Sequence, residues 1–305
     1  MTVIVELGIS GFLKPGRFRW LRALAFMAIL AVLCVLTFNL TADATLRLAG
    51  LLSGEPFTTR AAAPHGARLA AVLVGSSMML AAYALAVRLG EQRVARELNL
   101  RCAPGELALG ILIGGTIMAI IIGILWCGGW VVINASPVTA VSESLKQTIQ
   151  SAVVEEVVLR IVMFRMLWRA FGVWPALIAT ALLFGGLHLS NPDASLFGAL
   201  CLVAGEGIGA GLYLLTGRIW MSIGMHAGWN FTQGWLFGSV VSGLDSFSGG
   251  PLSTRPAEGV ATLLSGGGFG PEATIAALFV SLVGSGVCLG LAWRNGRFVN
   301  NGDTQ

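Results

Sequence analysis

The sequence predicts an all-α, polytopic integral membrane protein with about eight transmembrane helices in a single domain, residues 1–305. Two observations support this fold class. Of the residues 55% are hydrophobic and only 11% are charged, and the mean hydropathy is +0.80. Soluble domains usually carry about 25% charged residues. In addition, apolar runs near the roughly 20 residues that a bilayer requires recur along the whole chain, separated by prolines, glycines and polar residues.

The first apolar run follows a basic segment and resembles a secretory signal. It covers residues 20–40, after Lys14, Arg17 and Arg19, and Ala42-Asp43-Ala44 could serve as a cleavage site. The run is longer than the 7–15 apolar residues typical of a signal peptide, so we expect it to be retained as a span. The remaining runs cover residues 67–87, 107–133, 145–168, 173–189, 196–215, 219–241 and 274–293.

The distribution of basic residues orients these spans. With a cytoplasmic N-terminus, thirteen lysines and arginines fall in cytoplasmic segments and five on the opposite side. This asymmetry follows the positive-inside rule, so both termini are predicted to be cytoplasmic. The net charge of +4 therefore indicates contact with the lipid bilayer and no nucleic-acid partner. Residues 242–273 are rich in Gly, Ser and Pro without apolar periodicity, and we expect a flexible external loop there.

The fourth run contains ionisable residues at membrane depth. Glu155, Glu156 and Arg160 lie in the otherwise apolar segment 151–166, where each charge costs roughly 2.5–3.5 kcal/mol and usually has a function. Residues four apart share one helix face, so Glu156 and Arg160 are predicted to form an ion pair. Glu155 is rotated by about 100° from its neighbour and has no partner within its own helix. This carboxylate is therefore the candidate for chemistry.

Polar residues in later runs complete a candidate catalytic set. His188 ends the fifth run, and His226 and Asn230 lie four apart, hence on one face, in the seventh. There is no HExxH zinc motif, GxSxG nucleophile motif or intramembrane Gly-Asp pair, and the five cysteines form no CxxC. The remaining carboxylate, imidazoles and amide suit activation of water and stabilisation of an oxyanion. The predicted spans put Glu155, His188 and His226 at depths about 10 Å or more apart, so their convergence requires tilted or broken spans.

Three ordered motifs resemble those of the CPBP family, the CAAX-protease and bacteriocin-processing (Abi) intramembrane endopeptidases. They are Glu155-Glu156-x-x-x-Arg160, Phe184-x-x-x-His188 and His226-x-x-x-Asn230. The resemblance covers residues 151 to about 235, within a predicted catalytic core of residues 145–241. The sequence departs from the family where Leu159-Arg160-Ile161 replaces its usual Phe-Arg-Gly.

The resemblance implies a role for each residue. Glu155 would act as the general base on a water that His188 helps to hold, and Glu156 with Arg160 would form a structural ion pair. His226 and Asn230 would stabilise the developing oxyanion, which is worth roughly 3–4 kcal/mol for a good donor. No cofactor is required on this interpretation. Alternatively, Glu155, His188 and His226 could bind a catalytic Zn²⁺, because the family has been described as both glutamic and metallo-type proteases.

We therefore expect an intramembrane endopeptidase acting on a membrane-associated or lipid-modified peptide or protein, located in a bacterial inner (plasma) membrane. Two alternatives stay open at this level. The polar residues could relay protons or bind a solute in a transporter, although no internal repeat is evident. The chain could also be a non-catalytic scaffold or bacteriocin-immunity protein. Glu206 is a further acid within a span, between glycines, and has no identified partner.

Overall fold

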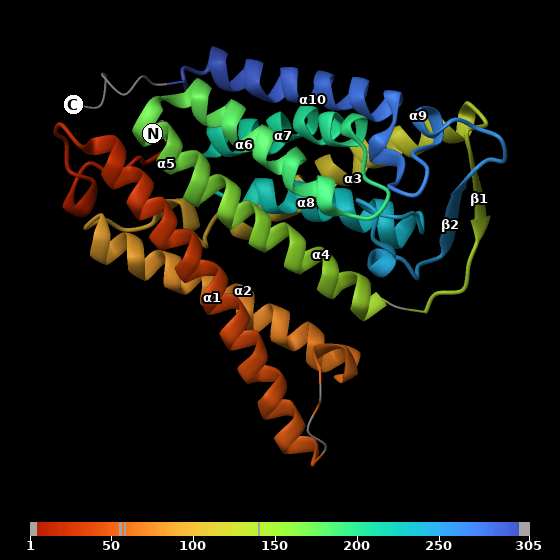
Figure 1. The fold of residues 1–305 in the computed structure, drawn as a ribbon, viewed down its shortest axis with the longest axis horizontal. Coiled ribbons are helices and arrows are strands. Elements are labelled where there is room, and N and C mark those ends of the chain that lie inside the picture. The colour runs from red at the N-terminus through yellow and green to blue at the C-terminus, as the bar shows by residue number, and fades with distance from the viewer. Residues whose placement is uncertain (1–4, 55–56, 58, 140, 299–305) are drawn as a thin grey trace.

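The computed structural model of the chain is a bundle of long helices with a small two-stranded sheet at one edge (Figure 1). It describes residues 5–54, 57, 59–139 and 141–298. The helices are α1 (Arg19–Ser53), α2 (His65–Gly90), α3 (Ala103–Cys127), α4 (Val141–Glu156), α5 (Arg165–Phe171), α6 (Val173–Leu187), α7 (Leu196–Thr216), α8 (Trp220–Phe231), α9 (Thr262–Ser265) and α10 (Ile275–Arg294). Strand β1 (Val131–Ala135) pairs antiparallel with β2 (Leu252–Pro256), so that Ile133 lies opposite Thr254.

One continuous helical rod organises the bundle. A π-helical segment, Val157–Phe164, joins α4 directly to α5. Figure 1 shows this rod crossing the molecule, with the α1–α2 hairpin against one side and α6, α7 and α10 on the other. Helix α8 contacts α3, α4 and α7, and it continues as a second π-helical segment, Thr232–Leu236. The rod and α8 therefore occupy the interior, where polar side chains are shielded from lipid.

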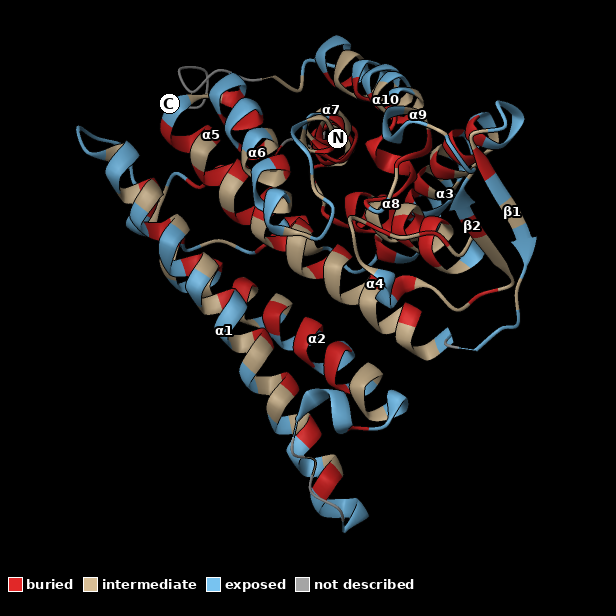
Figure 2. Ribbon diagram, turned by 45° about the vertical axis from the view of Figure 1, so that its right-hand side comes forward, coloured by how far each residue is buried: buried red, intermediate tan, exposed pale blue. Residues whose placement is uncertain are grey.

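The outer helices present apolar side chains to the surroundings. Large exposed hydrophobic residues line α1, α3, α6 and α10, for example Leu40, Leu112, Ile178 and Phe279. Figure 2 shows exposed positions recurring along these helices, whereas the interior of the bundle is buried. Such an apolar exterior is expected for a protein whose surrounding solvent is lipid. The prediction of an all-α polytopic membrane protein is confirmed.

Within the described residues, six helices are long and apolar enough to cross a membrane: α1, α2, α3, α6 with its 3₁₀ extension to Ser190, α7 and α10. The other two predicted spans, residues 145–168 and 219–241, correspond to the rod and to α8 with its π-helical extension. Both are helical, but both are interrupted by π-helical turns and carry the polar residues of the interior. The count of eight spans and the cytoplasmic location of the termini stay predictions.

Residues 242–273 have more regular structure than their composition indicates. They include β2, α9 and two 3₁₀ turns, and Phe247 and Phe269 are buried. The backbone N–H of Gly243 donates to the carbonyl of Phe269, which closes the segment on itself. The segment therefore packs against the bundle, and its 3₁₀ turn Pro271–Ala273 brings Glu272 to the interior. The division of the chain into a catalytic core and a loop stays a prediction.

Paired glycines bring α3 and α8 into close contact. Gly110 and Gly114 on α3 face Gly224 and Gly228 on α8, and each pair is spaced by four residues. A Cβ atom on Gly114 would lie 1.9 Å from the carbonyl oxygen of Met225, and one on Gly228 would lie 2.2 Å from that of Ile111. Small residues at this spacing allow helix backbones to approach closely in membranes. This contact fixes the position of the helix that carries His226 and Asn230.

Candidate active site

The two adjacent acids lie where the central rod changes from α-helix to π-helix. Glu155 and Glu156 end α4, and Arg160 lies in the π-helical segment that follows. π-helical turns are rare and frequently occur at functional sites because they change the direction of side chains. The position at which the family usually has a glycine is occupied here by Ile161, whose side chain is fully buried. The larger residue is therefore accommodated inside the bundle.

The predicted ion pair between Glu156 and Arg160 is present, and it has a third member. Arg160 Nε donates to Glu156 Oε2 at 2.7 Å. The same guanidinium contacts both carboxylate oxygens of Glu206 on α7, with 2.9 Å from Nη2 to Oε2. All three side chains are buried. Glu206, which had no identified partner in the sequence, therefore shares Arg160 with Glu156.

His226 lies between the two acids of α4. Its Nδ1 is 3.2 Å from Glu156 Oε1, and its Nε2 is 3.8 Å from Glu155 Oε2. Glu156 also accepts a hydrogen bond from Ser222 on α8, one turn before His226. By contrast, Glu155 Oε2 is buried without any hydrogen-bond partner among the described residues. One carboxylate is thus fixed by three neighbours, and the other has an oxygen free to bind a ligand.

His188 approaches the same carboxylate from the end of α6. Its Nδ1 is 2.8 Å from the carbonyl oxygen of Phe184, so that nitrogen donates and Nε2 remains available. His188 and Glu155 line the same cavity. The Phe184 ring lies 4.6 Å from the His188 ring and 6.3 Å from the His226 ring, between centroids. Phe184 therefore contacts both imidazoles.

Asn230 is held by the neighbouring helix. Its Nδ2 donates to Ser151 Oγ on α4 at 3.0 Å. Ser151 precedes Glu155 by four residues and shares its helix face. The amide thus lies on the same side of α4 as Glu155, and the hydrogen bond fixes α8 against α4.

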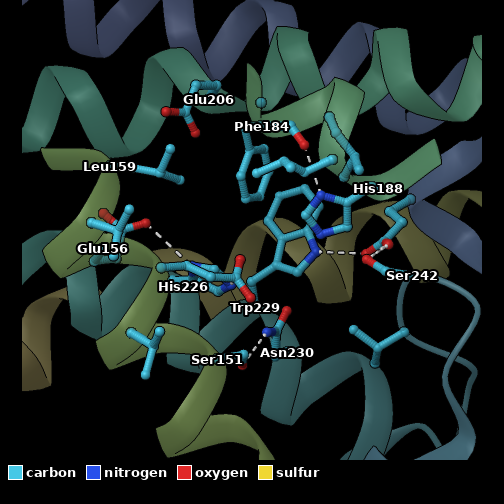
Figure 3. Close-up of a pocket in the computed structure, with 18 of the residues that line it drawn as sticks. Ser151, Glu156, Leu159, Phe184, His188, Glu206, His226, Trp229, Asn230 and Ser242 are labelled. Atoms are coloured by element: carbon cyan, nitrogen blue, oxygen red, sulfur yellow. Dashed lines mark hydrogen bonds and ion pairs between the residues drawn. The ribbon is translucent and has the colours of Figure 1, made fainter. Parts of the chain in front are cut away.

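These side chains surround one cavity of about 460 Å³. Glu155, His188, His226 and Asn230 all line it, together with Glu156, Arg160 and Glu206. Figure 3 shows the labelled side chains converging from α4, α6, α7 and α8. Glu155, His188 and His226, which the sequence predicts at different depths, thus line one cavity. They can do so because α6 ends at Leu187 and α8 is short and lies inside the bundle.

Several further cavity residues were not identified from the sequence, among them Trp229, Ser242 and Glu272. Trp229 could have been suspected, since it lies three residues after His226 on the same helix. Ser242 and Glu272 belong to the segment rich in Gly and Pro, where no periodicity indicates which side chains face inward. Their placement depends on the fold of that segment.

The donor types of the site suit zinc, but their arrangement does not present a complete ligand set. Both histidines use Nδ1 for a carbonyl or carboxylate, which is the usual second contact of zinc-binding imidazoles. However, in the described ranges no group of three or more His, Cys, Asp or Glu side chains is arranged to hold a metal ion. Binding of Zn²⁺ by Glu155, His188 and His226 stays a prediction.

Comparison with protein families agrees with the motifs. Residues 137–232 match the model of the family described as type II CAAX prenyl endopeptidase Rce1-like. The matched region contains Glu155, His188, His226 and Asn230. No curated protein and no solved structure gives a significant match to the chain. Residues 137–232 therefore form a domain of the Rce1-like CAAX endopeptidase family, the family that the three motifs resemble.

Proposed function

We propose that this protein is an intramembrane endopeptidase that cleaves a membrane-associated peptide or protein with a water activated by Glu155. The observation that carries the proposal is the buried Oε2 of Glu155, which has no hydrogen-bond partner in the described part of the chain and lies 3.8 Å from His226 Nε2 in a cavity among apolar helices. An unsatisfied carboxylate oxygen in such a place is costly unless it binds a ligand. A water molecule is the simplest ligand, and its activation is the chemistry that the family performs.

In the proposed reaction, the water hydrogen-bonds to Glu155 and to His188 Nε2. The hydrogen bond from His188 Nδ1 to the Phe184 carbonyl leaves Nε2 as an acceptor, so this imidazole can orient the water. Glu155 removes a proton as the water oxygen attacks the substrate carbonyl. The same proton then passes from Glu155 to the nitrogen of the leaving amine as the peptide bond breaks. Protons and charge are conserved over the cycle.

His226 is the proposed donor to the oxyanion. Because its Nδ1 faces Glu156, its Nε2 can donate only when the imidazole carries both protons. Two carboxylates flank the ring and favour this cationic form. Asn230 would assist with the amide N–H that Ser151 does not use. The Glu156–Arg160–Glu206 network then has a defined purpose, because it holds the acid that fixes the orientation of His226.

The substrate class follows from the location of the cavity. Its lining also includes apolar residues of the rod and of α6 and α7, among them Met163, Leu183 and Leu202. A peptide or protein at the membrane, including one that carries a lipid group, could reach such a site from the bilayer. We further propose a bacterial inner membrane as its location.

The proposal is tested with purified protein in detergent and a quenched library of prenylated and unmodified peptides. Wild type, Glu155→Ala and Glu156→Ala are compared, each with and without a chelator. We expect wild type to cleave and Glu155→Ala to be inactive while remaining folded. Cleavage that persists in Glu155→Ala would exclude the mechanism.

The chelator treatment separates the two types of peptidase. Loss of wild-type cleavage on chelation, with recovery on addition of Zn²⁺, would assign a metalloprotease. Unchanged cleavage would support water activation by the carboxylate alone. Glu156→Ala serves as the structural comparison, because its loss should lower stability as well as activity.

A further inference from the structure

Glu272 is a second carboxylate in the cavity that neither the motifs nor the proposed mechanism uses. It lies in the 3₁₀ turn Pro271–Ala273 before α10, and it is only 3% exposed. Its Oε2 accepts a hydrogen bond from Trp229 Nε1 at 3.3 Å, and its Oε1 accepts one from Ser242 Oγ. Both donors also line the cavity. Glu272 therefore lines the same cavity as the proposed catalytic residues.

Glu272 differs from every other buried glutamate in the described part of the chain. The other five each form an ion pair with an arginine: Glu91 with Arg165, Glu97 with Arg93, Glu106 with Arg218, and both Glu156 and Glu206 with Arg160. The hydrogen-bond donors to Glu272 are an indole and a hydroxyl, which carry no charge. Burying a carboxylate without a cation is unfavourable. We therefore expect a bound ligand to supply a positive charge next to Glu272.

The net charge of the cavity also favours a cationic ligand. Four glutamates and one arginine line it. If His188 and His226 are neutral, the net charge of the cavity is −3. If both are protonated, it is −1. A cavity with this balance and walls of low dielectric constant favours a cationic ligand over a neutral one.

The carboxylate is also held rigidly. Ser242, one of its donors, has a positive φ of 49°, a strained conformation for a residue other than glycine. The carbonyl of Ser242 accepts a hydrogen bond from Asn191 Nδ2 at 2.9 Å, which connects it to the turn after His188. Trp229, the other donor, is fixed on α8. An orientation maintained from two sides is typical of a binding group.

We propose that Glu272 is a specificity residue that binds the side chain of a lysine or arginine in the substrate, close to the scissile bond. The inference rests on the proposed peptidase function. Trp229 follows His226 by three residues, which corresponds to about 4.5 Å along α8. An extended peptide covers that distance in one or two residues, at about 3.3 Å each. The basic side chain should therefore lie within two positions of the cleaved bond.

The test compares peptides that differ only by lysine or norleucine at each of these positions. For wild type, we expect kcat/KM to be roughly 10–100-fold higher for the lysine peptide at one position. Glu272→Gln removes the charge and keeps one acceptor oxygen, for Trp229 Nε1, while its amide N–H can donate to the Ser242 hydroxyl oxygen. It should abolish the preference for lysine while cleaving the norleucine peptide within about twofold of wild type. The matched control is Glu258→Gln, an exposed acid in the same segment, which should change neither rate.

Two results would overturn the assignment. Either an unchanged lysine preference in Glu272→Gln, or an equal loss of activity on both peptides, would make Glu272 a structural residue only. Peptide binding to Glu155→Gln, measured by competition with a fluorescent peptide, separates this inference from the proposed function. A lysine preference in binding that Glu272→Gln removes would support the subsite even if no peptide were cleaved. Cleavage without any lysine preference would retain the peptidase and reject the subsite.

Discussion

Arg160 and Arg165 lie five residues apart on the same rod, and the two clusters around them differ in how their charges are matched. Arg165 binds both oxygens of Glu91 at 2.6 and 2.7 Å, and its Nε donates to the carbonyl of Ile161. Arg93 adds a second cation there, with bonds to Glu91 and Glu97 at 2.7 Å. Arg160, by contrast, is a single cation shared by Glu156 and Glu206.

The difference distinguishes a structural cluster from a site. Burial by itself would raise the pKa of Glu97, but the hydrogen bond from Arg93 and the charge of Arg165 overcome this penalty and lower the pKa below its ordinary value. Glu97 is thus stabilised in its charged form, and Glu91 beside it is bound by two arginines. Around Arg160 the acids outnumber the arginine, and Glu155 next to them keeps a free oxygen. We propose that the matched charges around Arg165 stabilise the fold, whereas Glu155 beside the Arg160 cluster is available for chemistry.

The largest effect on activity is expected from Glu155→Gln, beside the Arg160 cluster. Removing the general base should lower kcat by roughly 10²–10⁴-fold, with no loss of thermal stability, because Glu155 forms no ion pair with an arginine of the described residues. Peptide cleavage and melting in detergent are measured on the same preparation. A variant that loses activity only in proportion to its loss of folded protein would contradict the assignment of Glu155 to chemistry.

The opposite pattern is expected from Arg165→Met. Glu91 would lose two hydrogen bonds and stay buried, so the free energy of unfolding should fall by about 3 kcal/mol. The molecules that remain folded should cleave at nearly the wild-type rate. Denaturant titration in detergent gives the first quantity, and the rate per folded molecule gives the second. If the rate falls as far as in Glu155→Gln, the two clusters cannot be separated into fold and function.

An intermediate effect is expected from Gly114→Ala, which disturbs the site through the backbone. The new Cβ would lie 1.9 Å from the Met225 carbonyl, so α8 has to move together with His226. We expect overpacking to cost about 1–3 kcal/mol of stability and to lower activity. Gly123→Ala on the same helix is the control, since a Cβ there meets no atom within 4 Å. Equal activity in the two variants would show that the α3–α8 contact does not position the site.

Local spacing predicted part of this arrangement from the sequence. The helical interval of four gave the Glu156–Arg160 pair and the shared face of His226 and Asn230, because both depend on one helix only. Apolar runs predicted the fold class, because each run likewise lies within one helix. The rod and α8 are too polar and interrupted to qualify as simple spans, since their surroundings are protein side chains and not lipid.

Contacts between distant segments were beyond the reach of the sequence. Glu206 meets Arg160 across 46 residues, and no local pattern in the sequence indicates which helix faces pack against each other. Glu272 was missed because residues 242–273 show no periodicity from which an inward side chain could be inferred. The glycine pairs on α3 and α8 were detectable as two four-residue spacings, but only the structure shows that they face each other.

The smallest effect should come from Glu206→Gln, and it tests whether the surplus acid near Arg160 is needed. Glutamine keeps one acceptor oxygen for the guanidinium and removes one of the two charges that share it. We expect the free energy of unfolding to change by about 1 kcal/mol or less, because Glu156 still pairs with Arg160 at 2.7 Å. Glu156→Gln, measured in parallel, should cost more, since Glu156 also holds His226 and Ser222. Equal costs for the two variants would mean that the acids are interchangeable, and that His226 is oriented by something other than the carboxylate beside it.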